Sequence, residues 1–176
     1  PGMTEFFINL LHTYERIEIY AVRGNHGSLG KFAAKTTNFD TITYKILALK
    51  LAEYGDRIAF NIEDKAFFQI VDILGHKFLL IHGDQIPMHI TLPWYGITTR
   101  VQRWKTSMPE SFDVVCMGHF HSSSFLVYNR VPIFVNGSFL TGDEYSLKKI
   151  GLAGTPQQWT FGVGRSCLLY TSDAAD

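Results

Sequence analysis

The chain has 176 residues, of which 46% are hydrophobic and 14% are aromatic. This length fits one domain with a sizeable core, and the composition is that of a folded protein, not a disordered one. Sixteen basic and sixteen acidic residues give a formal net charge of zero, which excludes a broad electrostatic attraction to nucleic acid. No apolar run approaches the roughly 20 residues that span a bilayer, so we expect no membrane contact.

Helices and strands alternate in the first part of the chain. Residues 3–14 predict a helix, because apolar residues recur at spacings of three and four, and a strand is expected at 17–22. Thr37 or Asn38 would cap a second helix, and Gly55 would end it. The predicted apolar face of this helix consists of Phe39, Ile42, Ile46 and Leu49.

Hairpins dominate the later part of the chain. After a strand at 58–62, residues 67–73 and 76–81 predict two strands that are joined by a tight turn. A third helix is expected at 95–107, with a solvated basic face. Further strands are predicted at 113–117, 124–128, 131–135 and 158–163. Alternating elements followed by hairpins favour an α/β protein with a mixed sheet.

Three short segments place metal-ligand residue types directly after strand-like runs. They are Arg23-Gly24-Asn25-His26-Gly27, Ile81-His82-Gly83-Asp84 and Met117-Gly118-His119-Phe120-His121. In an open α/β sheet, ligands gather just beyond the carboxyl ends of the strands. Imidazole nitrogen and amide oxygen suit Mn, Fe, Zn or Co, and the lack of thiolate argues against a structural zinc site. The three segments therefore predict a metal site.

This order of motifs, GNH, then HG, then GHxH, resembles the C-terminal motif series of the calcineurin-like metallophosphoesterases, over about residues 19–138. The resemblance implies an α/β fold, a fragment of a four-layer αββα sandwich with mixed β-sheets. It also implies a two-metal enzyme that hydrolyses phosphate esters. We expect two divalent ions, manganese first, with iron, zinc, cobalt or nickel as alternatives.

The resemblance also implies a role for each motif residue. Asn25, His82 and His119 would hold the second metal, and His121 would reach the first. His26 would act as the general acid, or would donate a hydrogen bond to the phosphate. Each residue also has a structural interpretation. A single His at a strand end is more often a satisfied polar group, and Asn25 could cap a helix or hold a left-handed turn.

Two residues are candidates for substrate binding. Arg23 could steer an anionic substrate or could pair with a nearby carboxylate. Most members of the family continue GNH with Asp or Glu, whereas Gly27 follows here. The Gly-rich loop that it begins could bring Lys31 to a substrate phosphate or be only a connection. On these residues we prefer a phosphodiesterase or nuclease to a phosphomonoesterase, with nucleic acid or a nucleotide as partner.

Other parts of the family pattern are absent from the chain. It contains no D-x-H motif, and none of its Gly-Asp pairs completes G-D-x-x-D. We expect residues 1–166 to be one domain truncated at its N-terminus, and this fragment to be inactive although the full-length protein is an enzyme. Residues 167–176 resemble a translated sequencing adapter and are expected to be non-native. The alternative function is a non-catalytic binding or scaffold member of the fold.

The number of cysteines indicates the cellular compartment in which we expect the protein. Of two cysteines, Cys167 lies in the suspect tail, which leaves Cys116 in a buried-looking run. One internal cysteine argues against a disulfide framework and fits a reducing compartment, so we expect a cytoplasmic protein. The valines that flank Cys116 should raise the pKa of its thiol and make it a poor nucleophile.

Overall fold

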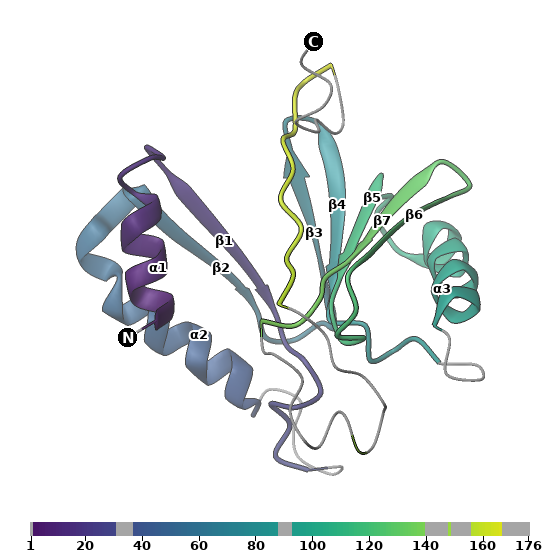
Figure 1. Cartoon of the computed structure of the whole chain (residues 1–176), viewed down its shortest axis with the longest axis horizontal. Coiled ribbons are helices and arrows are strands. Elements are labelled where there is room, and N and C mark those ends of the chain that lie inside the picture. Colours follow the sequence, from purple (N-terminus) through teal and green to yellow (C-terminus); the bar gives the residue numbers. More distant parts are fainter. Residues whose placement is uncertain (1, 31–36, 88–92, 140–147, 149–155, 167–176) are drawn as a thin grey trace. The chain divides into compact units, whose positions relative to one another are not determined.

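The computed structural model describes residues 2–30, 37–87, 93–139, 148 and 156–166 (Figure 1). Its elements are α1 (Gly2–Leu10), β1 (Ile17–Val22), α2 (Phe39–Lys50), a 3₁₀ segment η1 (Ala52–Arg57), β2 (Ile58–Glu63), β3 (Phe68–Ile73), β4 (His76–Ile81), α3 (Trp94–Ser107), β5 (Val114–Met117), β6 (Ser124–Tyr128) and β7 (Val131–Val135). The chain forms two compact units, Pro1–Gln69 and Ile70–Asp176. One sheet is a parallel pair and the other is mixed, so the predicted α/β class is confirmed.

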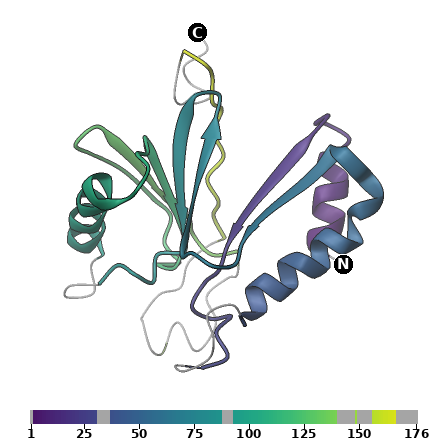
Figure 2. The same ribbon diagram turned by 180° about the vertical axis from the view of Figure 1, so that it is seen from behind.

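The first unit packs two helices against a pair of parallel strands. Residues 17–22 of β1 face residues 58–63 of β2 in register. A parallel pair needs a crossover connection, and α2 lies within it. Figures 1 and 2 show α1 and α2 on the same side of the two strands. The core between these elements consists of buried Leu11, Leu47, Leu51 and Ile58.

The two ends of α2 are set by local chemistry. Asn38 is the N-cap, and its side-chain oxygen accepts a hydrogen bond of 2.8 Å from the Asp40 amide. Of the two predicted caps, Asn38 is therefore the one that is used. The helix ends at Lys50, earlier than predicted, and Gly55 instead provides a positive φ of 53° within η1.

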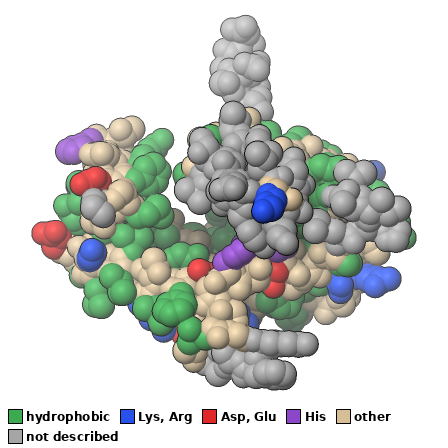
Figure 3. Space-filling view, turned by 60° about the horizontal axis from the view of Figure 1, so that its bottom comes forward, with side chains coloured by type: hydrophobic (Ala, Val, Ile, Leu, Met, Phe, Trp, Pro, Cys, Tyr) green, Lys and Arg blue, Asp and Glu red, His purple; other side chains and the backbone are tan. Residues whose placement is uncertain are grey.

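The predicted apolar face of α2 is not the face that the helix buries. Its members are exposed, at 57% for Phe39, 42% for Ile42, 49% for Ile46 and 76% for Leu49. The helix buries Thr41 and Leu47 instead. Leu47 lies about 100° around the helix from Ile46, so the helix contacts the strands through a neighbouring stripe. Apolar side chains that reach the protein surface are green in Figure 3.

The second unit is a five-stranded sheet in the order β3-β4-β5-β7-β6. β4, β5 and β7 are parallel neighbours, and β6 is antiparallel to β7. The predicted hairpins are confirmed, and their turns use positive φ angles: 56° at Leu74 and 93° at Gly75, then 47° at Asn129 and 66° at Arg130. Paired positive φ angles match the right-handed twist of the flanking strands.

α3 connects β4 to β5 and contributes to the core of the second unit. It buries Gly96, Ile97, Val101 and Trp104. The Lys105 ammonium donates to the Phe112 carbonyl and lies over the Phe112 ring. Of the cations on the predicted basic face, Arg103 is exposed, whereas Arg100 and Lys105 are half-buried. No helix in the described part of the chain combines the length and apolar character needed to cross a bilayer.

The strand predicted at 158–163 is not formed, because only Gly162 makes an isolated β-bridge. The segment is held by aromatic packing and side-chain hydrogen bonds. The Phe161 ring stacks on Phe134 with centroids 4.4 Å apart. The Trp159 amide donates to the Asn136 side chain at 2.9 Å, and the Trp159 indole donates to the Val135 carbonyl. These contacts replace the backbone ladder of a strand.

Candidate metal centre

Two of the predicted ligands follow neighbouring parallel strands. β4 and β5 run in parallel, so their carboxyl ends lie at the same edge of the sheet. The ladder continues beyond the strands, because the Gly118 amide donates to the His82 carbonyl at 2.9 Å. His82 and His119 therefore emerge at one edge, as the sequence pattern predicts.

The two imidazoles are in direct contact. His82 Nε2 lies 3.3 Å from His119 Nδ1, and the ring centroids are 5.1 Å apart in an edge-to-face arrangement. Two nitrogens that share one ion at bond lengths of about 2.1 Å lie about 3.0–3.4 Å apart at octahedral to tetrahedral angles. The pair thus fits a shared divalent transition metal. The same spacing also suits a hydrogen bond between a protonated and an unprotonated ring nitrogen.

Gly83 makes this close approach possible. Its φ of 118° lies in a region that side chains other than glycine rarely adopt. A Cβ at this position would lie 3.0 Å from His119 Cβ and 3.3 Å from the Gly118 carbonyl oxygen. Sequence reasoning included Gly83 in a motif but gave it no role. The sequence signal for this role was the position of Gly83 directly after the candidate ligand His82.

The segment that carries His119 and His121 is a tight turn. Both residues have positive φ, at 70° and 56°. This conformation is uncommon for side chains other than glycine and is found at functional sites more often than elsewhere. Phe120 lies between them, 9% exposed, with its ring against that of His119. The side-chain alternation of a strand, which would point His119 and His121 in the same direction, therefore does not apply to this turn.

The remaining predicted ligands are placed differently. His121 is exposed, and in the described ranges no three His, Cys, Asp or Glu side chains come together as a metal-binding group. Asn25 belongs to the first unit, in the loop after β1. The ligand roles of Asn25 and His121 stay predictions. Lys31 lies outside the described residues.

The loop with Asn25 and His26 is well anchored although both residues are exposed. The buried Asn38 side chain donates to the Gly24 carbonyl at 3.0 Å, and the Asp40 carboxylate accepts from the Gly24 amide at 2.8 Å. Asn25 does not adopt the left-handed conformation that was one alternative for it. The structure therefore presents Asn25 and His26 to solvent from a fixed backbone, and the role of His26 as general acid stays a prediction.

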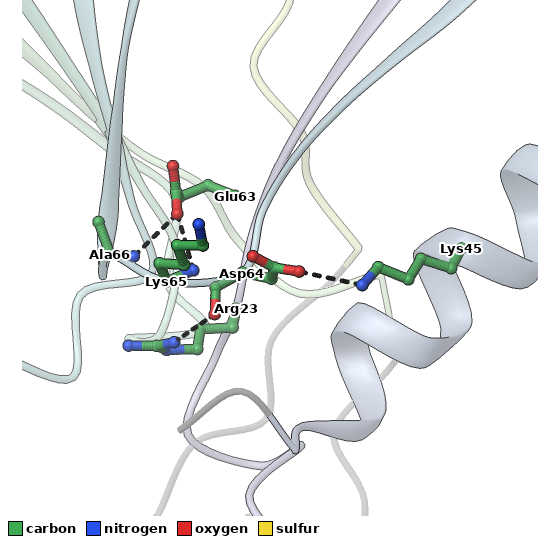
Figure 4. Close-up of polar contacts among 6 residues, drawn as sticks. All are labelled: Arg23, Lys45, Glu63, Asp64, Lys65 and Ala66. Atoms are coloured by element: carbon green, nitrogen blue, oxygen red, sulfur yellow. Dashed lines mark hydrogen bonds and ion pairs between the residues drawn. The ribbon is translucent and has the colours of Figure 1, made fainter. Parts of the chain in front are cut away.

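Arg23 is bonded within the first unit (Figure 4). Its guanidinium donates to the backbone carbonyl of Asp64 at 3.0 Å. The Asp64 carboxylate instead accepts from the Lys45 ammonium at 3.0 Å, and this contact lowers the pKa of Asp64. Glu63 caps the next turn by accepting from the Lys65 and Ala66 amides. A contact between Arg23 and substrate stays a prediction.

Cys116 is not a candidate nucleophile. Burial raises the pKa of its thiol to about 12, in agreement with the prediction from its flanking valines. A thiol with such a pKa carries almost no thiolate at neutral pH, and the thiolate is the reactive form.

A protein family and several solved structures are similar to this chain. A model of the calcineurin-like phosphoesterase family matches residues 2–137. No curated protein sequence matches the chain. Among solved structures, Vps29 from Entamoeba histolytica complexed with Zn²⁺ is 15% identical with a TM-score of 0.42, and the match covers 77% of this chain and 64% of that one. The chain therefore spans less than two thirds of that protein's length.

Two further structures are similar to the same degree. A Thermotoga maritima protein is 17% identical over 75% of this chain and 71% of its own, with a TM-score of 0.43. An archaeal phosphodiesterase is 16% identical over 77% of this chain and 76% of its own, with a TM-score of 0.39. Because these TM-scores are low, the assignment of the chain to a family depends on the family model. Because that model matches most of the chain, the chain belongs to the calcineurin-like phosphoesterase family.

Proposed function

We propose that this chain carries part of a metal-dependent phosphoesterase centre, in which His82 and His119 bind one divalent cation. The observation that supports this proposal is the 3.3 Å approach of their ring nitrogens at the carboxyl ends of adjacent parallel strands, in a member of this family. In the whole protein we propose hydrolysis of phosphate esters at two ions, with manganese as the first candidate and iron, zinc, cobalt or nickel as alternatives.

The bound cation would neutralise charge on the phosphate and activate water for its attack. In the proposed site, His82 and His119 orient the cation, Asn25 adds a third ligand to it, and His121 reaches the other cation. His26, on its anchored loop, would give a proton to the leaving oxygen. We propose phosphodiesters, including nucleotides or nucleic acid, ahead of phosphomonoesters, because Arg23 precedes this loop and can attract an anion.

A second candidate function is supported by a specific observation. The chain lacks D-x-H and G-D-x-x-D, and its described residues hold a pair of histidines instead of a group of three or more metal-binding side chains. A protein with this donor set could bind metal weakly and serve as a binding or scaffold module. Metal affinity and turnover separate the two functions.

Paramagnetic broadening by Mn²⁺ tests the metal site in the chain itself. We expect Mn²⁺ to broaden the NMR signals around His82 and His119 first, and His82→Ala or His119→Ala to abolish that effect. His76→Ala is the matched control, because His76 is in the same unit and bonds to the Gly164 carbonyl at 3.0 Å. No broadening, or broadening centred elsewhere, would contradict the proposed metal site.

Turnover is best measured on a chain in which D-x-H and G-D-x-x-D are placed ahead of residue 1. With Mn²⁺, such a chain should hydrolyse bis-p-nitrophenyl phosphate faster than p-nitrophenyl phosphate, and His82→Ala should abolish both activities. Metal binding without hydrolysis of either compound would favour the binding or scaffold function. The present chain should bind Mn²⁺ weakly and turn over neither compound.

A further inference from the structure

The first turns of α2 hold the end of β1 and the loop that follows it. Three side chains make these contacts, and we call them the α2 clamp: Asn38, Asp40 and Tyr44. Asn38 and Asp40 bind the carbonyl and the amide of the same residue, Gly24, at 3.0 and 2.8 Å. The Tyr44 hydroxyl donates to the Val22 carbonyl at 3.3 Å. The backbone directly before Asn25 is thus fixed from one helix.

Gly27 provides the space that the clamp occupies. A Cβ on Gly27 would lie 2.6 Å from Asp40 Cγ and 2.7 Å from Asp40 Oδ1, and it would overlap Asn38 Oδ1. These atoms cannot move aside at low cost, because both side chains are hydrogen-bonded and Asn38 is only 4% exposed. The Gly27 carbonyl also accepts from the Phe39 amide at 2.7 Å. The absence of a side chain at position 27 is therefore a requirement of the contact with Asp40.

The Asp40 carboxylate is well suited to this position. It lies in the first turn of α2, where the helix dipole stabilises a negative charge. Its Oδ2 accepts from the Gly24 amide, and a hydrogen bond to a charged acceptor is stronger than one to a neutral acceptor. Tyr44, one turn later, faces the same charge. The pKa of its hydroxyl is raised, mainly because the side chain is buried and further because of the charge of Asp40.

From this geometry we propose that Asp40 is the positioning residue for Asn25 and His26, and that Gly27 is the residue that admits its carboxylate. Asp40 does not act on metal or substrate. It fixes the backbone of Gly24, which sets the direction in which the next two side chains leave the loop. The functional part of this inference rests on the proposed metal centre, whereas the structural part does not.

Amide hydrogen exchange at Gly24 measures the clamp directly. Asp40→Ala should speed exchange of this amide about tenfold or more, given the usual worth of a hydrogen bond to a charged group. Asp40→Asn retains an acceptor oxygen and should restore most of the protection. Asp72→Ala is the matched control, because the Asp72 carboxylate accepts from the Gly75 amide at the same 2.8 Å. It should expose Gly75 and leave Gly24 unchanged.

Two further readouts separate positioning from a general loss of structure. The ¹⁵N order parameters of Asn25 and His26 should fall from about 0.85 to below about 0.6 in Asp40→Ala and stay high in Asp40→Asn and Asp72→Ala. Gly27→Ala should reproduce the Asp40→Ala phenotype. The Gly27→Ala/Asp40→Ala double variant should show less than the sum of the two effects, because both changes disrupt one contact.

The outcomes for the clamp and for the metal centre are distinct. Unchanged Gly24 exchange in Asp40→Ala would overturn the clamp, and unchanged order parameters of Asn25 and His26 would overturn its positioning role. If the unmodified chain binds Mn²⁺, then Asp40→Ala should weaken that binding at least about fivefold through Asn25, and Asp72→Ala should not. Failure of the unmodified chain to bind Mn²⁺ would contradict the proposed function, while the exchange and order-parameter results still decide the role of Asp40.

Discussion

His82 Nε2 and His119 Nδ1 lie 3.3 Å apart, on residues that follow two adjacent parallel strands. The sheet brings the two backbones to the same edge, and the Gly118 amide bond to the His82 carbonyl fixes their register. The turn that bears His119 then adopts a positive φ, which brings its ring against His82. The contact therefore depends on sheet pairing and on a strained turn together.

Metal binding should stabilise the chain through this pair. At about 100 times its dissociation constant, Mn²⁺ should raise the free energy of unfolding by about 2.7 kcal/mol, and EDTA should reverse the gain. His82→Ala or His119→Ala should weaken binding at least about tenfold. Thermal unfolding with and without Mn²⁺ measures the gain, and calorimetric titration measures the affinity. Equal stabilisation of both variants by Mn²⁺ would show that the metal binds elsewhere.

Gly83→Ala should destabilise the second unit by about 1–3 kcal/mol, because the φ of 118° disfavours any side chain and the new Cβ meets His119 Cβ at 3.0 Å. Urea unfolding measures the change. Gly75→Ala is the control, since its φ of 93° imposes a similar strain but a Cβ there meets nothing within 4 Å. If the two variants lose equal stability, contact with His119 contributes nothing to the cost.

The buried and exposed leucines of α2 should respond differently to substitution. Leu47→Ala should cost about 2–4 kcal/mol, because Leu47 is 8% exposed and belongs to the core of the first unit. Leu49→Ala should change the free energy of unfolding by less than about 0.5 kcal/mol, because Leu49 is 76% exposed. Chemical denaturation measures both values. A large loss in Leu49→Ala would mean that this stripe is covered in solution.

The ion pair between Lys45 and Asp64 should make a salt-sensitive, pH-dependent contribution to stability. Lys45 lowers the pKa of Asp64 in the folded protein. The contribution is therefore present above the unfolded pKa of the carboxyl and is lost as the pH falls through the lowered folded pKa. Lys45→Met should be less stable than the unmodified chain at neutral pH, and the two should converge in acid. Urea midpoints across this pH range provide the measurement, and parallel curves would contradict it.

Alkylation should report the burial of the Cys116 thiol. Because burial raises the pKa of Cys116 to about 12, iodoacetamide should modify it far more slowly than a free thiol at neutral pH. Peptide-level mass spectrometry separates Cys116 from Cys167. The rate at Cys116 should rise sharply when denaturant exposes the thiol. Rapid modification in the folded chain would show that this strand opens or that the thiol is accessible.

Local patterns in the sequence predicted most elements correctly. β1 and the two hairpins with their turns follow from alternation and turn residues, which act over a few neighbouring positions. The same reasoning failed where packing between segments distant in the sequence determines which side chains are buried and whether a strand forms. Periodicity showed an apolar stripe on α2 but could not show which stripe would face the strands. It also predicted a strand at 158–163, where packing of Trp159 and Phe161 took the place of a ladder.

The sequence by itself determined the family, because three short motifs in a fixed order require only residue identity and spacing. Tertiary structure alone decided the contact of His82 with His119, the need for glycine at position 83 and the clamp of Asp40 on the loop beside Gly27. The physical reason is distance along the chain. These contacts join segments that are far apart in sequence, and their geometry depends on strand pairing, positive φ angles and the space left by a missing Cβ.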